Sequence, residues 1–128
     1  MARRPLPPGN VPMVTETHRR LALELRMSIE TLISKPSAGA YNQVSKMLAA
    51  LGRAGMTGTA LTLANDTMAE VCDRYERVGK VGVSTLEAEW LRYAAGGIDQ
   101  LLPLIPVNKF NEAVVAVDVF CATVGATT

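Results

Sequence analysis

The fold is most clearly indicated by residues 84–103, which read STLEAEWLRYAAGGIDQLLP. Ser84 and Glu87 have the spacing of a capping box, in which each side chain accepts a hydrogen bond from the other residue's backbone N–H. Apolar residues then recur at helical spacing as far as Pro103, which does not continue a helix. The expected buried stripe consists of Leu86, Trp90, Ala94, Ile98 and Leu101. The segment therefore predicts an amphipathic helix that begins after Ser84.

Three segments upstream of this helix show the same helical periodicity. We expect a first helix from residue 15 or 17 to about residue 34, a second from about 37 to 54 and a third from about 59 to 78. A Lys-Pro pair ends the first, and glycines suit the ends of the other two. The residues expected to face inward are Leu21, Leu25, Ile29, Leu32 and Ile33, then Tyr41, Val44, Leu48 and Leu51, then Leu61, Ala64, Met68, Val71, Cys72 and Tyr75.

The C-terminal segment carries two competing signals. After a turn between two prolines, Asn108 can cap a last helix, whereas the β-branched run at residues 114–117 would also suit a strand. We favour the helix, whose apolar stripe would hold Phe110, Val114, Val117 and Cys121. The sequence therefore predicts an all-α fold, a single compact bundle of four to five helices.

Residues 1–14 differ in composition from the rest of the chain. They contain four prolines, and proline removes a backbone donor and disfavours helix in the residue before it. We therefore expect an extended, flexible arm rich in proline and arginine at residues 1–14 and one helical domain at residues 15–128. The run Pro5-Leu6-Pro7-Pro8 is also compatible with a polyproline ligand.

The composition is that of a globular protein, with 48% hydrophobic residues, 20% charged residues and a formal net charge of +1. This charge gives no reason to expect nucleic acid or a membrane as a partner. The longest apolar stretch, residues 113–124, is too short for a bilayer and contains Asp118. The N-terminus lacks a signal-peptide pattern. A secreted domain of this size usually carries several paired cysteines, so the two isolated cysteines favour the reducing cytoplasm.

The sequence contains few residues that could perform catalysis. His18 is the only histidine, and the neighbouring cations of Arg19 and Arg20 disfavour its protonation. Cys72 and Cys121 lack the spacing of a zinc site, and no pattern pairs either of them with a base. We therefore expect no catalytic residue, no cofactor and no metal.

Carboxylates offer the main alternative to this expectation. Asp66, Glu70 and Asp73 lie three or four residues apart on one face of the third helix, a spacing compatible with a divalent cation. Arg74 and Arg77 follow four residues after the last two, so we interpret this face as a set of solvated ion pairs. Asp118 lies on an apolar helix, and the sequence leaves open whether it bonds an arginine internally or faces a partner.

Basic residues gather in the N-terminal quarter, which is the main signal for nucleic-acid binding. Arg3, Arg4, Arg19 and Arg20 could together grip phosphates although the net charge is low. A helix-turn-helix needs an exposed basic recognition helix, but residues 61–66, which follow the tightest helical turn, are apolar and acidic. DNA binding through these arginines is therefore the alternative function.

Small residues in the fourth helix provide a candidate protein interface. Ala94, Ala95, Gly96 and Gly97 would allow a second helix to approach closely. Glycine inside a helix costs about 1 kcal/mol relative to alanine, so the glycine pair indicates close packing or a kink. We expect this patch to contact a protein partner, and a homodimer is one form of such contact.

A set of segments also resembles a group of known proteins. These segments are Arg3-Arg4-Pro5-Leu6, His18-Arg19, Met47 to Leu51 with Gly55, Ala64 to Tyr75, Gly82, and Glu89 to Leu101. From Arg3 to Val117 the chain resembles small helical proteins of proteobacterial genomes, plasmids and prophages, some of which carry the label Fis-family transcription regulator. Fis regulators have a basic C-terminal helix-turn-helix, whereas residues 114–128 contain no lysine or arginine.

The resemblance implies an accessory protein of a bacterial mobile element or phage. Combined with the lack of catalytic patterns, it leads to the hypothesis of a non-enzymatic chain that binds a protein and inhibits or modulates a host machine. DNA-binding regulation is the second hypothesis. An enzyme is the third, and it would require a pocket that gathers Asp118 or the carboxylates of residues 66–73.

Overall fold

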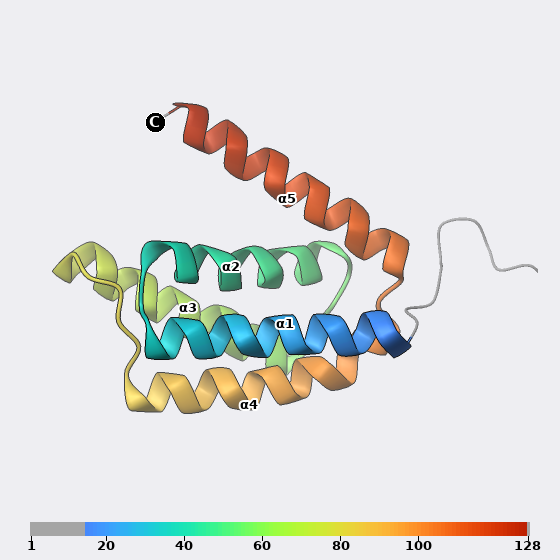
Figure 1. Ribbon diagram of the computed structural model, residues 1–128, viewed down its shortest axis with the longest axis horizontal. Helices are drawn as coiled ribbons and strands as arrows, with labels where there is room; N and C mark the ends of the chain where they lie inside the picture. Colours follow the sequence, from blue (N-terminus) through green and yellow to red (C-terminus); the bar gives the residue numbers. More distant parts are fainter. Residues whose placement is uncertain (1–14, 128) are drawn as a thin grey trace, which may run out of the picture.

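The computed structural model describes residues 15–127, so the arm predicted for residues 1–14 lies outside the described part. The elements are α1 (Thr15–Ser34), α2 (Ala38–Arg53), α3 (Thr59–Val78), α4 (Thr85–Leu101), the short 3-10 helix η1 (Leu102–Leu104) and α5 (Val107–Thr127) (Figure 1). No strand occurs in this part of the chain. The all-α fold is confirmed, as is the preference for a helix over a strand in the C-terminal segment.

Local signals place the helix ends. The Ser37 hydroxyl accepts a hydrogen bond from the Ala40 N–H at 3.0 Å and caps α2, and Gly79 ends α3 with φ of 83°. The predicted capping box is present: the Glu87 N–H donates to Ser84 Oγ at 3.1 Å and the Ser84 N–H donates to Glu87 Oε1 at 2.9 Å. The predicted cap of α5 is wrong, because α5 already begins at Val107 and Asn108 lies inside its first turn.

The first four helices form a closed ring. α1 packs against α2 and α4, and α3 completes the ring by packing against the same two helices. α5 comes after the ring is complete and, among residues 15–127, approaches no helix other than α2 closely. It inclines away from α2 toward its C-terminal end (Figure 1).

The core confirms most of the predicted inward positions and corrects three. Tyr75, Leu86 and Trp90 are exposed by 42%, 52% and 39%. In its N-terminal half α4 buries Glu87 and Leu91 in place of Leu86 and Trp90, whereas Ala94 and Ile98 are buried as predicted. The apolar stripe alone favoured Leu86, because burying a glutamate is unfavourable unless the fold supplies a partner.

Arg74 of α3 is the partner of Glu87. Its guanidinium donates two hydrogen bonds to the carboxylate at 2.8 and 2.7 Å, and a third to the Gly82 carbonyl at 3.0 Å. These bonds lower the pKa of Glu87 and raise the pKa of Arg74. The predicted pairing of Arg74 with Glu70 is therefore wrong: Arg74 instead joins α3 to α4. Arg92 similarly joins α4 to α1 by donating to Glu30 at 2.7 and 3.0 Å.

The glycine pair of α4 marks close packing, which is one of the two alternatives that the sequence left open. A Cβ placed on Gly97 would lie 2.6 Å from Ala60 Cβ of α3, which is far inside a normal contact distance. Gly96 has no neighbouring atom within 4 Å of such a Cβ. Gly97 is therefore required by the approach of α3 to α4, whereas Gly96 is not.

We expect opposite effects from alanine at these two glycines. Gly97→Ala should destabilise the fold by about 1 to 3 kcal/mol, because the added methyl group forces α3 and α4 apart. Gly96→Ala should stabilise it by about 0.5 to 1 kcal/mol, because alanine is the better helix former and has room. Urea unfolding monitored by circular dichroism measures both. Equal effects of the two substitutions would contradict the close approach of Gly97 to Ala60.

The Glu87–Arg74 pair should make stability depend on pH. Since the folded pKa of Glu87 is lowered, its contribution is present above the unfolded value of about 4.3 and is lost as the pH falls through the folded value. Glu87→Gln should be less stable than the wild type by about 2 kcal/mol at pH 7, and the difference should shrink in acid. The control is Glu89→Gln, at an exposed position of the same helix, which should change stability by less than about 0.5 kcal/mol. A difference that stays constant with pH would refute this role of the pair.

Candidate protein interface

The composition of α5 distinguishes it from the other helices. Only Lys109, Glu112 and Asp118 are charged among its 21 residues, and the last 15 contain a single charge. A helix that packs through one face normally carries polar residues on the opposite face. Among the described helices α5 packs only against α2, and beyond Glu112 its exposed side is largely apolar, so it leaves hydrophobic surface in contact with solvent.

The exposed part of this surface lies beyond the first turns of α5. Phe110 and Ala113 are 7% and 2% exposed, because they pack onto the core. Val115, Val119 and Phe120 are exposed by 63%, 59% and 67%. We call these three residues together with the half-buried Ala116 the α5 face. No helix of residues 15–127, α5 included, is both long and apolar enough to cross a bilayer.

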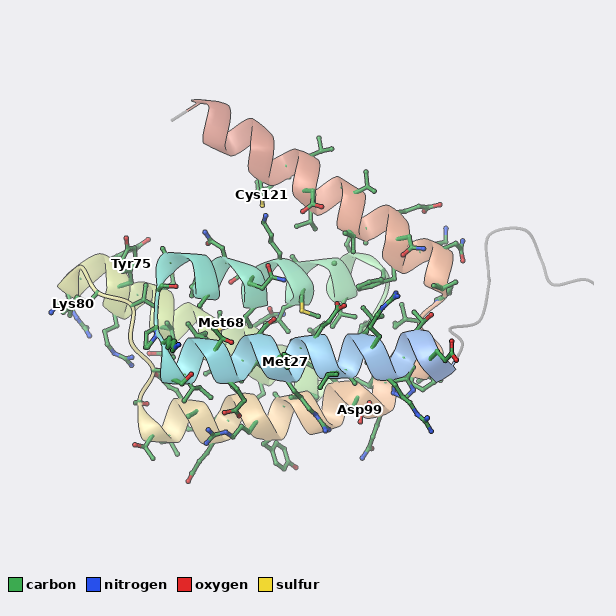
Figure 2. The ribbon with its side chains drawn as sticks, viewed as in Figure 1. Met27, Met68, Tyr75, Lys80, Asp99 and Cys121 are labelled. Carbon is green, nitrogen blue, oxygen red and sulfur yellow. The ribbon has the colours of Figure 1, made fainter. Side chains whose placement is uncertain are left out.

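Two grooves flank the contact between α2 and α5. The larger has a volume of about 780 Å³ and lies between the α2 side chains of Asn42 to Arg53 and the α5 residues Ala116, Phe120 and Cys121. Cys121 points from α5 toward α2 (Figure 2). The smaller groove, of about 510 Å³, lies on the side of α1 and reaches Arg20 and Glu24. The α5 face therefore continues into a concave surface.

Asp118 forms an ion pair with a lysine at the contact between α2 and α5. Its carboxylate lies 3.9 Å from Lys46 Nζ of α2, and both side chains are exposed. An exposed pair of this length contributes at most about 1 kcal/mol. The structure thus places Asp118 beside a lysine at the surface, not beside a buried arginine, and the alternative that Asp118 faces a partner stays a prediction.

The structure divides the predicted small-residue interface into two parts. Ala94 and Ala95 are 0% and 4% exposed and belong to the core, so they do not reach a partner in this structure. Gly96 and Gly97 line a shallow groove of about 840 Å³ between α3 and α4, with Tyr93 beside them. The small residues mainly serve the packing of α3 on α4 within the chain.

Only two of the four arginines that we expect to contact phosphate lie in the described part of the chain. Arg3 and Arg4 lie outside the described residues. Arg19 is exposed on the first turns of α1, and Arg20 lies 4.0 Å from Glu24 Oε1 at an exposed position. Of these four arginines, the structure therefore places only Arg19 and Arg20, at adjacent exposed positions of α1.

His18 has an architectural role that the sequence did not indicate. Its Nε2 donates to Asp99 of α4, at 2.7 Å from Oδ1 and 3.0 Å from the backbone carbonyl. Arg26 Nη2 lies 3.4 Å from the other carboxylate oxygen of Asp99, which projects from α4 in Figure 2. Since Asp99 is 81 residues from His18, no local pattern could have revealed this contact.

The predicted carboxylate face of α3 is exposed, and its described residues form no metal-ligand set. Asp66, Glu70 and Asp73 are all exposed. Within the described range, no three histidine, cysteine or acidic side chains are close enough to hold a metal ion. The structure therefore provides no support for a cation site at this position.

A second set of exposed apolar side chains lies on α4. Leu86, Trp90 and Tyr93 follow one another at helical spacing, and Tyr93 is 78% exposed. Charged residues, Glu89 and Arg92, alternate with them along the same helix. Single exposed apolar residues among charges are common on protein surfaces. The α5 face has one such charge beside it, Asp118, and is the stronger candidate.

Comparison with protein-family models, with curated proteins and with solved structures found no match to this chain.

Proposed function

We propose that this chain is a non-enzymatic protein that acts by binding another protein chain, and that the α5 face and the adjoining groove form its contact surface. The observation that carries the proposal is the outer side of α5. It exposes a valine pair and a phenylalanine, with Asp118 as the only charge after Glu112. Apolar patches of this kind mark sites of protein contact.

Burial of the α5 face by a partner would be energetically favourable. Full burial of a valine or phenylalanine contributes about 1.5 to 3 kcal/mol, and these side chains are more than half exposed. Aromatic residues beside grooves are typical anchors of protein interfaces, and Phe120 lines the larger groove. A partner that covers the face would therefore gain several kcal/mol from a small set of residues.

The biological setting is part of the same proposal. The resemblance to small helical proteins of plasmids and prophages favours an accessory role in a mobile element or phage. In that role, contact through the α5 face would inhibit or modulate a larger host machine. A DNA-binding regulator remains the competing proposal, because Arg19 is exposed on α1.

A pull-down tests the proposal against this competitor. The tagged chain and an untagged copy are expressed together in a proteobacterial host, and the lysate is divided into portions with and without nuclease. We expect the bait to retain a protein at simple stoichiometry in both portions. Recovery of nucleic acid alone, lost on nuclease treatment, would favour the regulator.

Matched variants link the retained protein to α5. Val115→Glu with Phe120→Glu should reduce retention at least tenfold, because each added carboxylate must be desolvated in the interface. The control is Leu23→Glu with Met27→Glu on α1, where the side chains are similarly exposed at 58% and 60%. The control should retain the partner. Retention that survives the α5 substitutions would contradict the proposed surface.

A further inference from the structure

We infer that the partner on the α5 face is a second copy of this chain, and that the two α5 helices pair in an antiparallel contact about a twofold axis. The inference rests on the proposed function, since it names the chain that covers the proposed surface. Three observations support it: the spacing of the exposed apolar residues, the position of their centre in the helix, and the placement of the charges.

The α5 face is complementary to itself. Its members, Val115, Ala116, Val119 and Phe120, are symmetric about a point between Val117 and Asp118. If a twofold axis passes through this point, Val115 lies opposite the partner's Phe120 and Ala116 lies opposite the partner's Val119. Each larger side chain then meets a smaller one, which suits close packing. Such a contact is isologous, as in most homodimers.

The centre of the face coincides with the centre of the helix. α5 extends from Val107 to Thr127, so its midpoint is Val117. Pairing at this register overlaps the two helices over nearly their full length, about 30 Å. Even the smallest stable interfaces bury about 600 Å² on each partner, and a shifted register would shorten the contact. The larger groove of about 780 Å³ adjoins the face and gives the partner helix further surface on α2.

The charges of α5 favour the antiparallel direction. At the inferred register, Lys109, Glu112 and Asp118 lie opposite residues 126, 123 and 117 of the second copy, none of which is charged. A parallel pair in register would place each of these side chains beside its own equivalent, and like charges brought together at an interface cost several kcal/mol. Asp118 also has Lys46 beside it, on α2.

The oligomeric state of the purified full chain tests the inference. Size-exclusion chromatography with light scattering at about 100 μM should give twice the chain mass of 13.7 kDa. Val115→Glu with Phe120→Glu should halve the observed mass while circular dichroism stays helical, and Leu23→Glu with Met27→Glu should remain dimeric. A monomeric wild type, or a dimer that the α5 substitutions leave intact, would overturn the inference.

Cross-linking tests the direction of the pair. In a background with Cys72→Ser and Cys121→Ser, a mixture of Ala116→Cys and Val119→Cys chains should be joined by a short bis-maleimide. Lys109→Cys chains alone should not be joined, because the two equivalent positions would be about 25 Å apart along the antiparallel helices. Cross-linking of Lys109→Cys chains would overturn the antiparallel arrangement, because it requires the two equivalent residues to lie side by side.

The two proposals fail in different ways. If the purified chain is monomeric but the pull-down retains a host protein that the α5 substitutions release, the second copy is refuted and protein binding through α5 stands. An acidic helix of that host protein would then suit the larger groove, whose charged residues are Lys46 and Arg53. If no protein is retained and no dimer forms, both proposals fail.

Discussion

Closure of the four-helix ring is the constraint on which the rest of the structure depends. Each of α1 to α4 buries its apolar stripe against two neighbouring helices, so most of the core is formed before the chain reaches α5, which adds Phe110 and Ala113. The fifth helix can only add to the outside, and it does so on α2. Phe110 and Ala113 of its first turns pack onto the core, whereas Val115, Val119 and Phe120 are left exposed to solvent. The candidate interface is therefore a consequence of how the core closes.

Polar contacts between helices set the orientation of α4 within this ring. The buried Glu87 carboxylate is matched by the Arg74 guanidinium, and His18 and Arg26 of α1 hold Asp99 at the other end of the helix. A buried carboxylate without such a partner would be costly, so α4 is fixed in the rotation that keeps the pair together. The same rotation turns Leu86 and Trp90 outward. The Arg74–Glu87 pair thus accounts both for the buried carboxylate of α4 and for the exposure of its apolar residues Leu86 and Trp90.

The α5 face differs from an ordinary exposed apolar residue in its continuity. On α4 the exposed aromatic residues alternate with charges, and such a surface is stable in water. On α5 the residues Val115, Ala116, Val119 and Phe120 form one strip whose two halves complement each other. In the proposed dimer, a second copy of the chain covers this strip. A larger host machine that binds the same helix would take the place of the second copy.

The sequence by itself limited the number of helices to four or five and determined nearly all of their boundaries and most of the core, because hydrophobic periodicity, the capping box at Ser84 and the helix-ending glycines and prolines are local properties. It also left close packing as one of two explanations for the glycine pair of α4. The tertiary structure decided what depends on residues far apart in the chain: the pairing of Arg74 with Glu87 in place of Glu70, the contact of His18 with Asp99, the burial of Ala94 and Ala95, and the exposure of α5. Periodicity shows which face of a helix is apolar, but only the packed helices decide which apolar faces are covered.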